Sequence, residues 1–216
     1  MTDKALIARR IARELHDGQL VNLGIGLPTQ VAHHLPKGVN VFFQSENGLI
    51  GMLPLPEDGF AWADLTDAGG RPVGAGPGAC AIDSAMSFGL IRGGHLDVTV
   101  LGGLQVDESG RLANWLVPGV MIPGMGGAMD LVTGAKRVIV AMTHTAKGTP
   151  KIVKRCSLPI TSMRRVDLIV TELAVIEPTP DGLILRETAP GVTIEQVLRA
   201  TEADLKVSDT ICSMST

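Results

Sequence analysis

A carboxylate, an amide and a glycine follow an apolar segment in the stretch "VNVFFQSENG", where Glu46, Asn47 and Gly48 come after a predicted strand. A Glu-Asn-Gly sequence is typical of an ordinary solvated turn. A carboxylate at the end of a buried strand can also serve as a nucleophile or a general base. The segment that follows, "GLIGMLPLP", is too apolar for an ordinary surface loop. Glu46 is therefore the leading candidate for chemistry.

The histidines give a weaker signal. His33 and His34 are adjacent, so they cannot share one helix face as a metal-binding pair at i and i+4 does. We expect these two residues and His16 to lie at the surface. His95 and His144 stand at a strand start and a strand end, where either could contact a ligand.

Other motifs for catalysis or cofactor binding are absent from the sequence. The "GIG" at residues 24–26 lacks the last glycine of a dinucleotide fingerprint and the acidic residue that reads a ribose, and neither GxxxxGK[ST] nor GxSxG occurs. The cysteines, Cys80, Cys156 and Cys212, are widely spaced and form no CxxC pair. This spacing argues against a zinc site and a disulfide framework, and it fits a reducing cytoplasm.

Helices and apolar strands alternate along the chain and must position these residues. Apolar spacing predicts a first helix capped by Asp3 and ended before Gly18, and a second helix that begins near Pro28. A third helix is expected from the cap Asp83 to the stop Gly93. The segment "TIEQVLRAT" predicts a last helix.

The predicted strands are apolar on both faces. They include "VNVFFQ", "LDVTVLGG", "RVIVAM" and "DLIVTELAVI", and Asp181-Gly182 predicts a hairpin near the end. Such strands indicate an α/β protein with a largely parallel open sheet and helices on both faces. Residues 48–81 are expected to be mostly loop. Because "VNLGIG", "FFQSENG" and "VLGGLQVD" all end in polar or glycine turns, we expect these turns to meet in one cleft.

The composition fits one domain over residues 1–216, with 45% hydrophobic and 19% charged residues. The net charge of -3 and the absence of a basic stripe argue against nucleic acid as a partner. The uncharged run over residues 112–129 approaches the length of a bilayer span, but it contains Pro118, Pro123 and four glycines. We therefore expect no membrane span, and no secretory signal in the charged N-terminal segment.

Six motifs carry a specific resemblance: "NLGIGLP", "QSENG", "SFGLIRGGHLD", "LGGLQVD", "ANW" and "PGMGGAMDLV". Their order and spacing resemble those of the β subunits of family I coenzyme A transferases over residues 4–176. The chain looks most like β subunits of the bacterial acetate/acetoacetate or 3-oxoacid type. The resemblance implies a single CoA-transferase-like (NagB/RpiA-like) domain in which Glu46 is the catalytic glutamate.

The resemblance implies a ping-pong transfer with Glu46 as nucleophile. Its carboxylate attacks an acyl-CoA thioester, and the displaced thiolate attacks the resulting mixed anhydride to leave a glutamyl-CoA thioester and a free acid. An incoming acid such as acetoacetate reverses these steps and takes the CoA. Coenzyme A is a substrate in this scheme, which needs no cofactor and no metal.

The resemblance also places further residues near Glu46. Asn22 is implied as a polar contact that could serve the oxyanion hole. Asn114, Gly127 and Ala128 match positions that line the groove for CoA in the family. Asn22 and Asn114 could equally be turn-forming amides that satisfy backbone groups.

The proposed nucleophile sets two physical requirements. An ionised carboxylate needs hydrogen-bond donors, which we expect from the turn amides around Asn47 and Gly48. Water must be excluded from the intermediates, and the apolar segment after Gly48 and the loop at Met121 to Met125 suit that purpose. Family members often carry a lysine just after position 69, where this chain has Gly70 and Arg71, so a contact between Arg71 and CoA stays open.

Family enzymes contain two such halves, and 216 residues correspond to one of them. The resemblance therefore implies a separate α subunit in an α2β2 hetero-oligomer, with acyl-CoA and carboxylic acids as substrates. Two other functions stay open. One is an acyl-CoA hydrolase that uses the same glutamate with water as acceptor, and the other is a non-catalytic binding subunit of the same fold.

Overall fold

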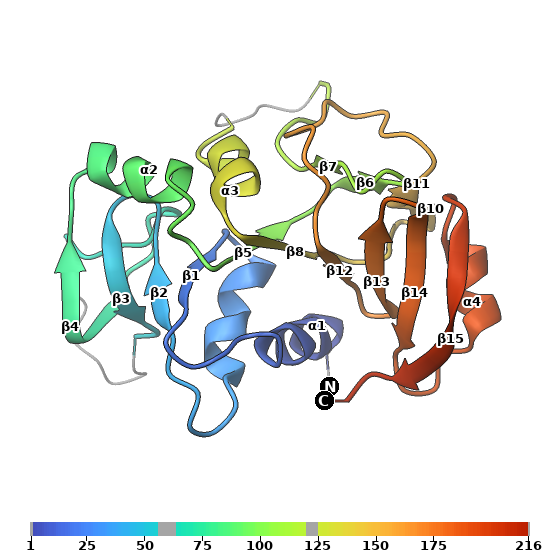
Figure 1. Cartoon of the computed structure of the whole chain (residues 1–216), viewed down its shortest axis with the longest axis horizontal. Coiled ribbons are helices and arrows are strands. Elements are labelled where there is room, and N and C mark those ends of the chain that lie inside the picture. The colour runs from blue at the N-terminus through green and yellow to red at the C-terminus, as the bar shows by residue number, and fades with distance from the viewer. Residues whose placement is uncertain (1, 56–63, 120–124, 216) are drawn as a thin grey trace.

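The computed structural model describes residues 2–55, 64–119 and 125–215. Ten strands form one sheet: β1 Leu20–Leu23, β2 Phe42–Gln44, β3 Leu49–Leu53, β4 Gly74–Ala81, β5 Val98–Gly102, β8 Arg137–Ala141, β12 Leu168–Val170, β13 Ala174–Thr179, β14 Gly182–Thr188 and β15 Leu205–Ser213. Their order across the sheet is β15-β14-β13-β12-β8-β5-β1-β2-β3-β4 (Figure 1). The middle strands from β12 to β2 are all parallel, whereas β3, β4 and β13 pair antiparallel with their neighbours. The predicted α/β class with a largely parallel sheet is confirmed.

The helices cover both faces of this sheet, as predicted. They are α1 Asp3–Ala12, the 3-10 helix η1 Leu27–His34, α2 Ser84–Arg92, α3 Ala128–Gly134 and α4 Ile194–Ala200. Figure 1 shows α1 and η1 on one side of the sheet and α2 and α3 on the other. Within the described ranges, no helix has the length and apolar character needed to cross a bilayer. The cytoplasmic location stays a prediction.

In the part of the chain that the structure describes, five short strands lie outside the main sheet. β6 Gln105–Asp107, β7 Leu112–Ala113 and β11 Ile152–Val153 form a three-stranded sheet, and β9 Thr145–Ala146 pairs with β10 Thr149–Pro150. The three-stranded sheet follows β5 along the chain, so it brings the residue after β7 back beside the end of β5.

The middle strands are buried on both faces, which explains their continuous apolar sequences. On β5, Val98 and Val100 pack in one core cluster with Ile11 of α1. Leu101 points to the opposite cluster, which contains Leu131 of α3. Successive side chains of a strand face opposite sides, so a strand covered on both sides needs apolar residues at every position.

Helix ends follow the expected capping chemistry with one exception. Asp83 caps α2 by accepting from the amide of Met86, and Gly93 is the C-cap, as predicted. The first helix is capped by Thr2 rather than by Asp3, which is its first residue. It ends at Ala12, well before the predicted stop. The Thr2 hydroxyl accepts the amide hydrogen of Ala5 at 3.4 Å, the bond that a capping side chain supplies.

Two strands occur where the sequence predicted mostly loop. β3 and the glycine-rich β4 form the edge of the sheet beyond β2. A Cβ on Gly51 of β3 would stand 3.0 Å from the Cα of Ala79 of β4, so the two backbones approach closely. The composition of β4 resembles that of a loop because glycines rarely favour strands, yet here they permit this approach. The predicted apolar run over residues 167–176 is also divided, by a turn between β12 and β13.

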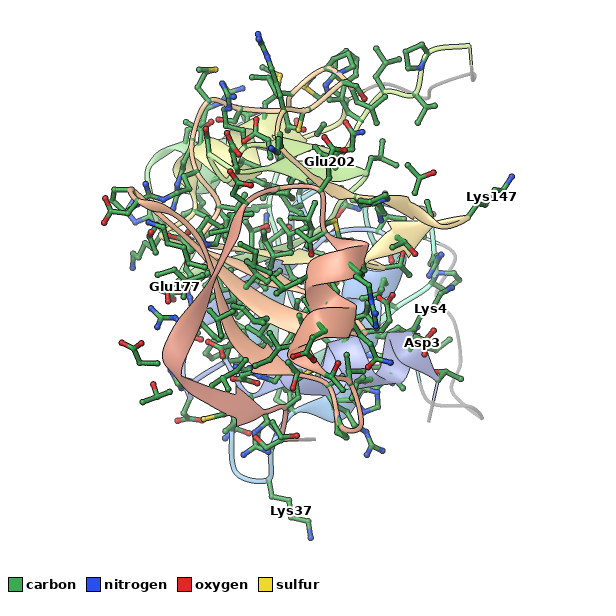
Figure 2. All side chains as sticks on the ribbon, turned by 90° about the vertical axis from the view of Figure 1, so that its right-hand side faces the viewer. Asp3, Lys4, Lys37, Lys147, Glu177 and Glu202 are labelled. Carbon is green, nitrogen blue, oxygen red and sulfur yellow. The ribbon has the colours of Figure 1, made fainter. Side chains whose placement is uncertain are left out.

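Charged side chains lie mainly on connections and outer surfaces. Figure 2 shows Lys37 and Lys147 extending away from the body of the molecule. Arg10 is an exception, since it is only 8% exposed. Its guanidinium donates to both carboxylate oxygens of Glu187 at 2.7 Å and to Glu14 at 2.6 Å. This bidentate pair joins α1 to β14, which lie far apart in the sequence.

His144, a candidate ligand contact in the sequence, is buried as a structural residue. Its Nδ1 and Nε2 each lie 2.9 Å from a hydroxyl, of Thr171 and of Thr201. Each hydroxyl also lies near a carbonyl oxygen, Thr201 at 2.8 Å from that of Val197 and Thr171 at 3.2 Å from that of Ala174. A neutral ring between them donates from one nitrogen and accepts at the other. Burial lowers the pKa of His144 to about 4, and the positive charge of Lys151 acts in the same direction.

Mild acid should therefore destabilise the fold through His144. Its pKa of about 4 in the folded protein lies below the ordinary 6.5. The stabilisation is thus complete above pH 6.5 and is lost as the pH falls towards 4. We expect this group alone to lower the free energy of unfolding by about 2 kcal/mol between pH 7 and pH 5, measured by urea denaturation. This loss of unfolding free energy between pH 7 and pH 5 should disappear in His144→Gln and persist in the exposed control His33→Gln. An unchanged pH dependence in His144→Gln would contradict the prediction.

Candidate active site

The carboxyl ends of β1, β2 and β5 lie side by side, as predicted, along the edge of the sheet that is formed by the ends of its parallel strands. β1 pairs with β2 on one side and with β5 on the other, so the order of strands reverses there, and ligands of open α/β sheets bind at such points. A cavity of about 490 Å³ lies at this edge. Its walls include residues 22–25, Glu46, residues 101–104, Asn114 and residues 125–128. The volume is within the range of small-molecule sites.

A tight turn places Glu46 at the end of β2. The amide of Gly48 donates to the carbonyl of Ser45 at 2.9 Å, and the amide of Ser45 donates to the carbonyl of Leu49 at 2.8 Å. These bonds close the turn between β2 and β3 with Glu46 at its corner. The Ser45 hydroxyl also accepts the amide hydrogen of Ala68 at 2.8 Å, which ties the turn to a neighbouring loop.

Gly48 is required by backbone conformation and by contact. Its φ is +113°, and a Cβ there would stand 1.9 Å from the carbonyl oxygen of Ile82. That same segment is held in place because the amide of Ile82 donates to the carbonyl of Gly48 at 2.9 Å. No side chain fits between these two backbones. Gly48 is thus a structural determinant of the turn that carries Glu46.

The carboxylate of Glu46 lies against the start of α3. The amide of Gly127, the N-cap of that helix, donates to Glu46 Oε1 at 3.3 Å. A Cβ on Gly127 would stand 2.1 Å from Glu46 Oε2, so only glycine allows the carboxylate to approach. Gly126 has a φ of +56° and also borders Oε1. A backbone N–H at the start of a helix stabilises a nearby negative charge.

Two of the groups that the turn itself was expected to offer Glu46 bond to other atoms. The Gly48 amide bonds within the turn, and the Asn47 side chain donates to the carbonyl of Thr66 at 2.9 Å. Neither residue lines the cavity. The donor to Glu46 comes instead from Gly127, 81 residues later. Two glycines just before a helix were the sequence signal for such an anion contact.

Asn22 lines the cavity, but its amide group bonds within the protein. Its Nδ2 donates to the side-chain oxygen of Gln44 at 2.8 Å and to the backbone carbonyl of Gln44 at 3.2 Å. Both amide hydrogens are therefore committed in this structure. Asn114 is different, since within the described residues its Nδ2 makes a single bond, to the carbonyl of Gly102 at 3.1 Å. Thr161 donates to its oxygen at 2.7 Å. Asn114 thus keeps one hydrogen for a ligand, and Ala128 also lines the wall.

Two segments were predicted to exclude water from Glu46, and the structure describes only part of them. The apolar segment after Gly48 forms β3, and its Leu49 and Met52 pack in the core rather than over Glu46. That part of the expectation is wrong. Residues 121–124 of the proposed covering loop lie outside the described residues, and Met125 lines the cavity. Arg71 borders a separate hollow of about 240 Å³ and not the cavity of Glu46.

The remaining candidates lie away from this cavity. His16, His33 and His95 are exposed, and none of them lines it. The cysteines are all free. Across residues 2–55, 64–119 and 125–215, no three His, Cys, Asp or Glu side chains gather in a way that could hold a metal ion.

Comparisons with known proteins agree on one family. The model of the coenzyme A transferase family matches residues 4–200. The chain is 57% identical to the β subunit of the acetate CoA-transferase of Haemophilus influenzae, over 97% of this chain and 94% of that protein. It is 50% identical to one subunit of the succinyl-CoA:3-ketoacid coenzyme A transferase of Helicobacter pylori (strain ATCC 700392 / 26695), over 93% of this chain and 97% of that protein.

A solved structure has the same fold. The acyl-CoA transferase apoenzyme from Escherichia coli O157:H7 superposes with a TM-score of 0.77 at 24% identity. The match covers 99% of this chain and 43% of that longer chain. At this identity the likeness supports the fold alone.

Replacement of Gly48 by alanine should strongly destabilise the protein. We expect Gly48→Ala to lower the free energy of unfolding by about 3–5 kcal/mol, because the new Cβ is strained at positive φ and displaces the Ile82 carbonyl. Gly182 is a matched control, since it has the same φ of +113° with no atom within 4 Å. Gly182→Ala should cost only about 1–2 kcal/mol. Urea denaturation of both variants measures the difference, and equal losses would refute the role of the contact.

Proposed function

The chain belongs to the coenzyme A transferase family, and we propose that it is a catalytic β subunit that transfers CoA through a glutamyl-CoA thioester on Glu46. The observation that carries this proposal is the Glu46 carboxylate, which lines a cavity at the switch point and accepts from the amide of Gly127. A carboxylate held by a backbone donor and open to a cavity is suited to attack a thioester.

The first half of the reaction forms the enzyme thioester. A Glu46 oxygen attacks the acyl carbon of an acyl-CoA, and the carbon–sulfur bond breaks. The CoA thiolate departs, and Glu46 and the acyl group are then joined as a mixed anhydride. The thiolate then attacks Cδ of Glu46, and the acyl group departs as a free carboxylate. The second acid then attacks the glutamyl-CoA thioester, the same steps run in reverse, and the acid leaves as its CoA thioester. Charge is conserved at each step, and no redox cofactor or metal is required.

Gly127 is proposed as an oxyanion donor for the steps at Glu46 Cδ. When sulfur attacks Cδ, negative charge develops on a carboxyl oxygen of Glu46. The Gly127 amide already lies 3.3 Å from Oε1, so it needs little movement to donate to that oxygen. Preorganised backbone donors of this kind stabilise transition states by about 3–4 kcal/mol. Asn114, with one uncommitted amide hydrogen, is proposed to contact CoA in the same cavity.

We propose acetyl-CoA or succinyl-CoA as the acyl donor and a short 3-oxoacid such as acetoacetate as the acceptor. The names of the two relatives support acids of this size. Each relative is named as one subunit of its enzyme, which supports a separate α subunit here, and we place that subunit in an α2β2 assembly. Ile25 on the cavity wall is 60% exposed, an apolar surface that such a partner would cover.

Incubation of the assembled enzyme with acetoacetyl-CoA should leave a covalent CoA adduct on the Glu46 peptide, detected by mass spectrometry. Glu46→Gln should form no adduct and should lose transfer activity by at least about 10³-fold, because an amide is a poor nucleophile. The exposed Glu108 lies outside the cavity, so Glu108→Gln serves as the control and should react normally. Full activity of Glu46→Gln would refute the mechanism. An adduct consumed by water as fast as by acetoacetate would indicate hydrolysis rather than transfer.

Gly127→Ala should impair the reaction while leaving the fold stable. Its φ of -85° and ψ of 9° suit alanine, but the new Cβ would displace the Glu46 carboxylate. We expect kcat to fall by about 100-fold and the unfolding free energy to change by less than about 1 kcal/mol. Gly89 is exposed on α2, lies outside the cavity, and a Cβ added there would meet no atom within 4 Å, so Gly89→Ala should keep near-normal kcat. Steady-state kinetics and urea denaturation provide the two readouts.

A further inference from the structure

A chain of buried polar side chains crosses the sheet beneath the cavity. Thr99 lies on β5, Asn22 on β1, Gln44 on β2 and Ser87 on α2, and their exposed fractions are between 0% and 2%. Amides and hydroxyls in such surroundings are costly unless each is hydrogen-bonded. The three strands are neighbours in the sheet, so the side chains form one row that ends at α2.

Every link of this row has a defined partner and direction. Thr99 donates to Asn22 Oδ1 at 3.2 Å, and Asn22 donates to Gln44 Oε1 at 2.8 Å. Gln44 Nε2 donates to Ser87 Oγ at 2.9 Å, and Ser87 donates to the backbone carbonyl of Glu46 at 2.8 Å. A serine has one hydroxyl hydrogen. Because Ser87 gives it to Glu46, Ser87 must accept from Gln44, which fixes the orientation of the Gln44 amide.

The end of the row is the peptide group that carries the Glu46 side chain. Glu46 lies two residues beyond Gln44, the last residue of β2, so its carbonyl lies outside the ladder between strands. Ser87 supplies a donor from α2 instead. The same helix carries Phe88, which borders the position of a Cβ on Gly127, so α2 lies next to both the Glu46 peptide and the Gly127 backbone. A hydrogen bond to the peptide group restricts the direction in which the Glu46 Cα–Cβ bond points.

We propose that Ser87 and Gln44 are positioning residues for Glu46. Ser87 fixes the Glu46 peptide so that the carboxylate meets the Gly127 amide, and Gln44 fixes the Ser87 hydroxyl. This inference rests on the proposed role of Glu46 as the nucleophile. Apolar side chains of similar shape at all four positions of the row would fill the same space and leave none of these amides or hydroxyls buried and unpaired, so stability alone does not require the row. Displacement of a reacting group by about 1 Å is enough to slow a reaction about 100-fold.

The test measures the rate of adduct formation on Glu46 in the assembled enzyme with acetoacetyl-CoA, together with KM and Tm. Ser87→Ala should slow adduct formation by about 10- to 100-fold, with KM changed by less than about threefold and with Tm above the assay temperature. Ser87→Thr keeps the hydroxyl and should recover most of the rate. Ser84 is exposed on the same helix, so Ser84→Ala is the matched control and should react normally.

A second variant tests the direction of the row. Gln44→Met keeps the length of the side chain but removes both the donor to Ser87 and the acceptor of Asn22 Nδ2. It should slow the reaction less than Ser87→Ala does, because Ser87 still bonds to Glu46. The double variant should react no more slowly than Ser87→Ala, since Gln44 acts through Ser87. If Ser87→Ala fails to fold, the rate of Gln44→Met alone decides the matter.

The outcomes separate this inference from the proposed function. No adduct on the wild-type enzyme would refute the role of Glu46 itself. A normal adduct on the wild type with equally fast Ser87→Ala and Gln44→Met variants would overturn only the positioning role. The positioning role would also be overturned if the variants changed mainly KM, or if the rate losses of the two single variants multiplied in the double variant.

Discussion

The site depends on a contact that leaves no room for a side chain. The Glu46 carboxylate lies against the backbone of Gly127, where a Cβ would stand 2.1 Å from a carboxylate oxygen. On the other side of the turn, Gly48 meets the carbonyl of Ile82 equally closely. Backbone segments thus hold the turn on one side and meet its carboxylate on the other. Backbone groups have few degrees of freedom, so they hold a nucleophile more firmly than flexible side chains do.

The sheet explains why this chemistry sits at its edge. The middle strands are covered on both faces, so their side chains must be apolar or fully hydrogen-bonded. Polar groups can therefore reach a ligand only where strands end. Asn22 and Gln44 are polar side chains inside the sheet that are hydrogen-bonded in this way, and their bonds lead to the Glu46 peptide through Ser87. A hydrogen-bonded row of this kind links the interior of the sheet to the turn that carries the carboxylate.

Features encoded within a few residues were predicted well. The Asp83 cap, the hairpin at Asp181-Gly182 and the buried parallel strands all occur as the sequence indicated. β3 and β4 were missed because the glycines of β4 carry a loop signal that close backbone packing overrides. The role of His144 was also left open by the sequence, because it depends on packing between distant segments. Its strand-end position is visible in the sequence, whereas its burial between two threonines is not.

The sequence by itself determined the family, the α/β order of elements and the candidate carboxylate Glu46, because motifs, caps and apolar periods are written in short stretches. The tertiary structure alone decided which groups surround that carboxylate. It brought the Gly127 amide to Glu46 across 81 residues, and it committed the Asn22 amide to Gln44. Hydrogen-bond partners are chosen by how distant segments pack, and each donor given to one acceptor is withdrawn from another. No local pattern of residue types specifies that choice.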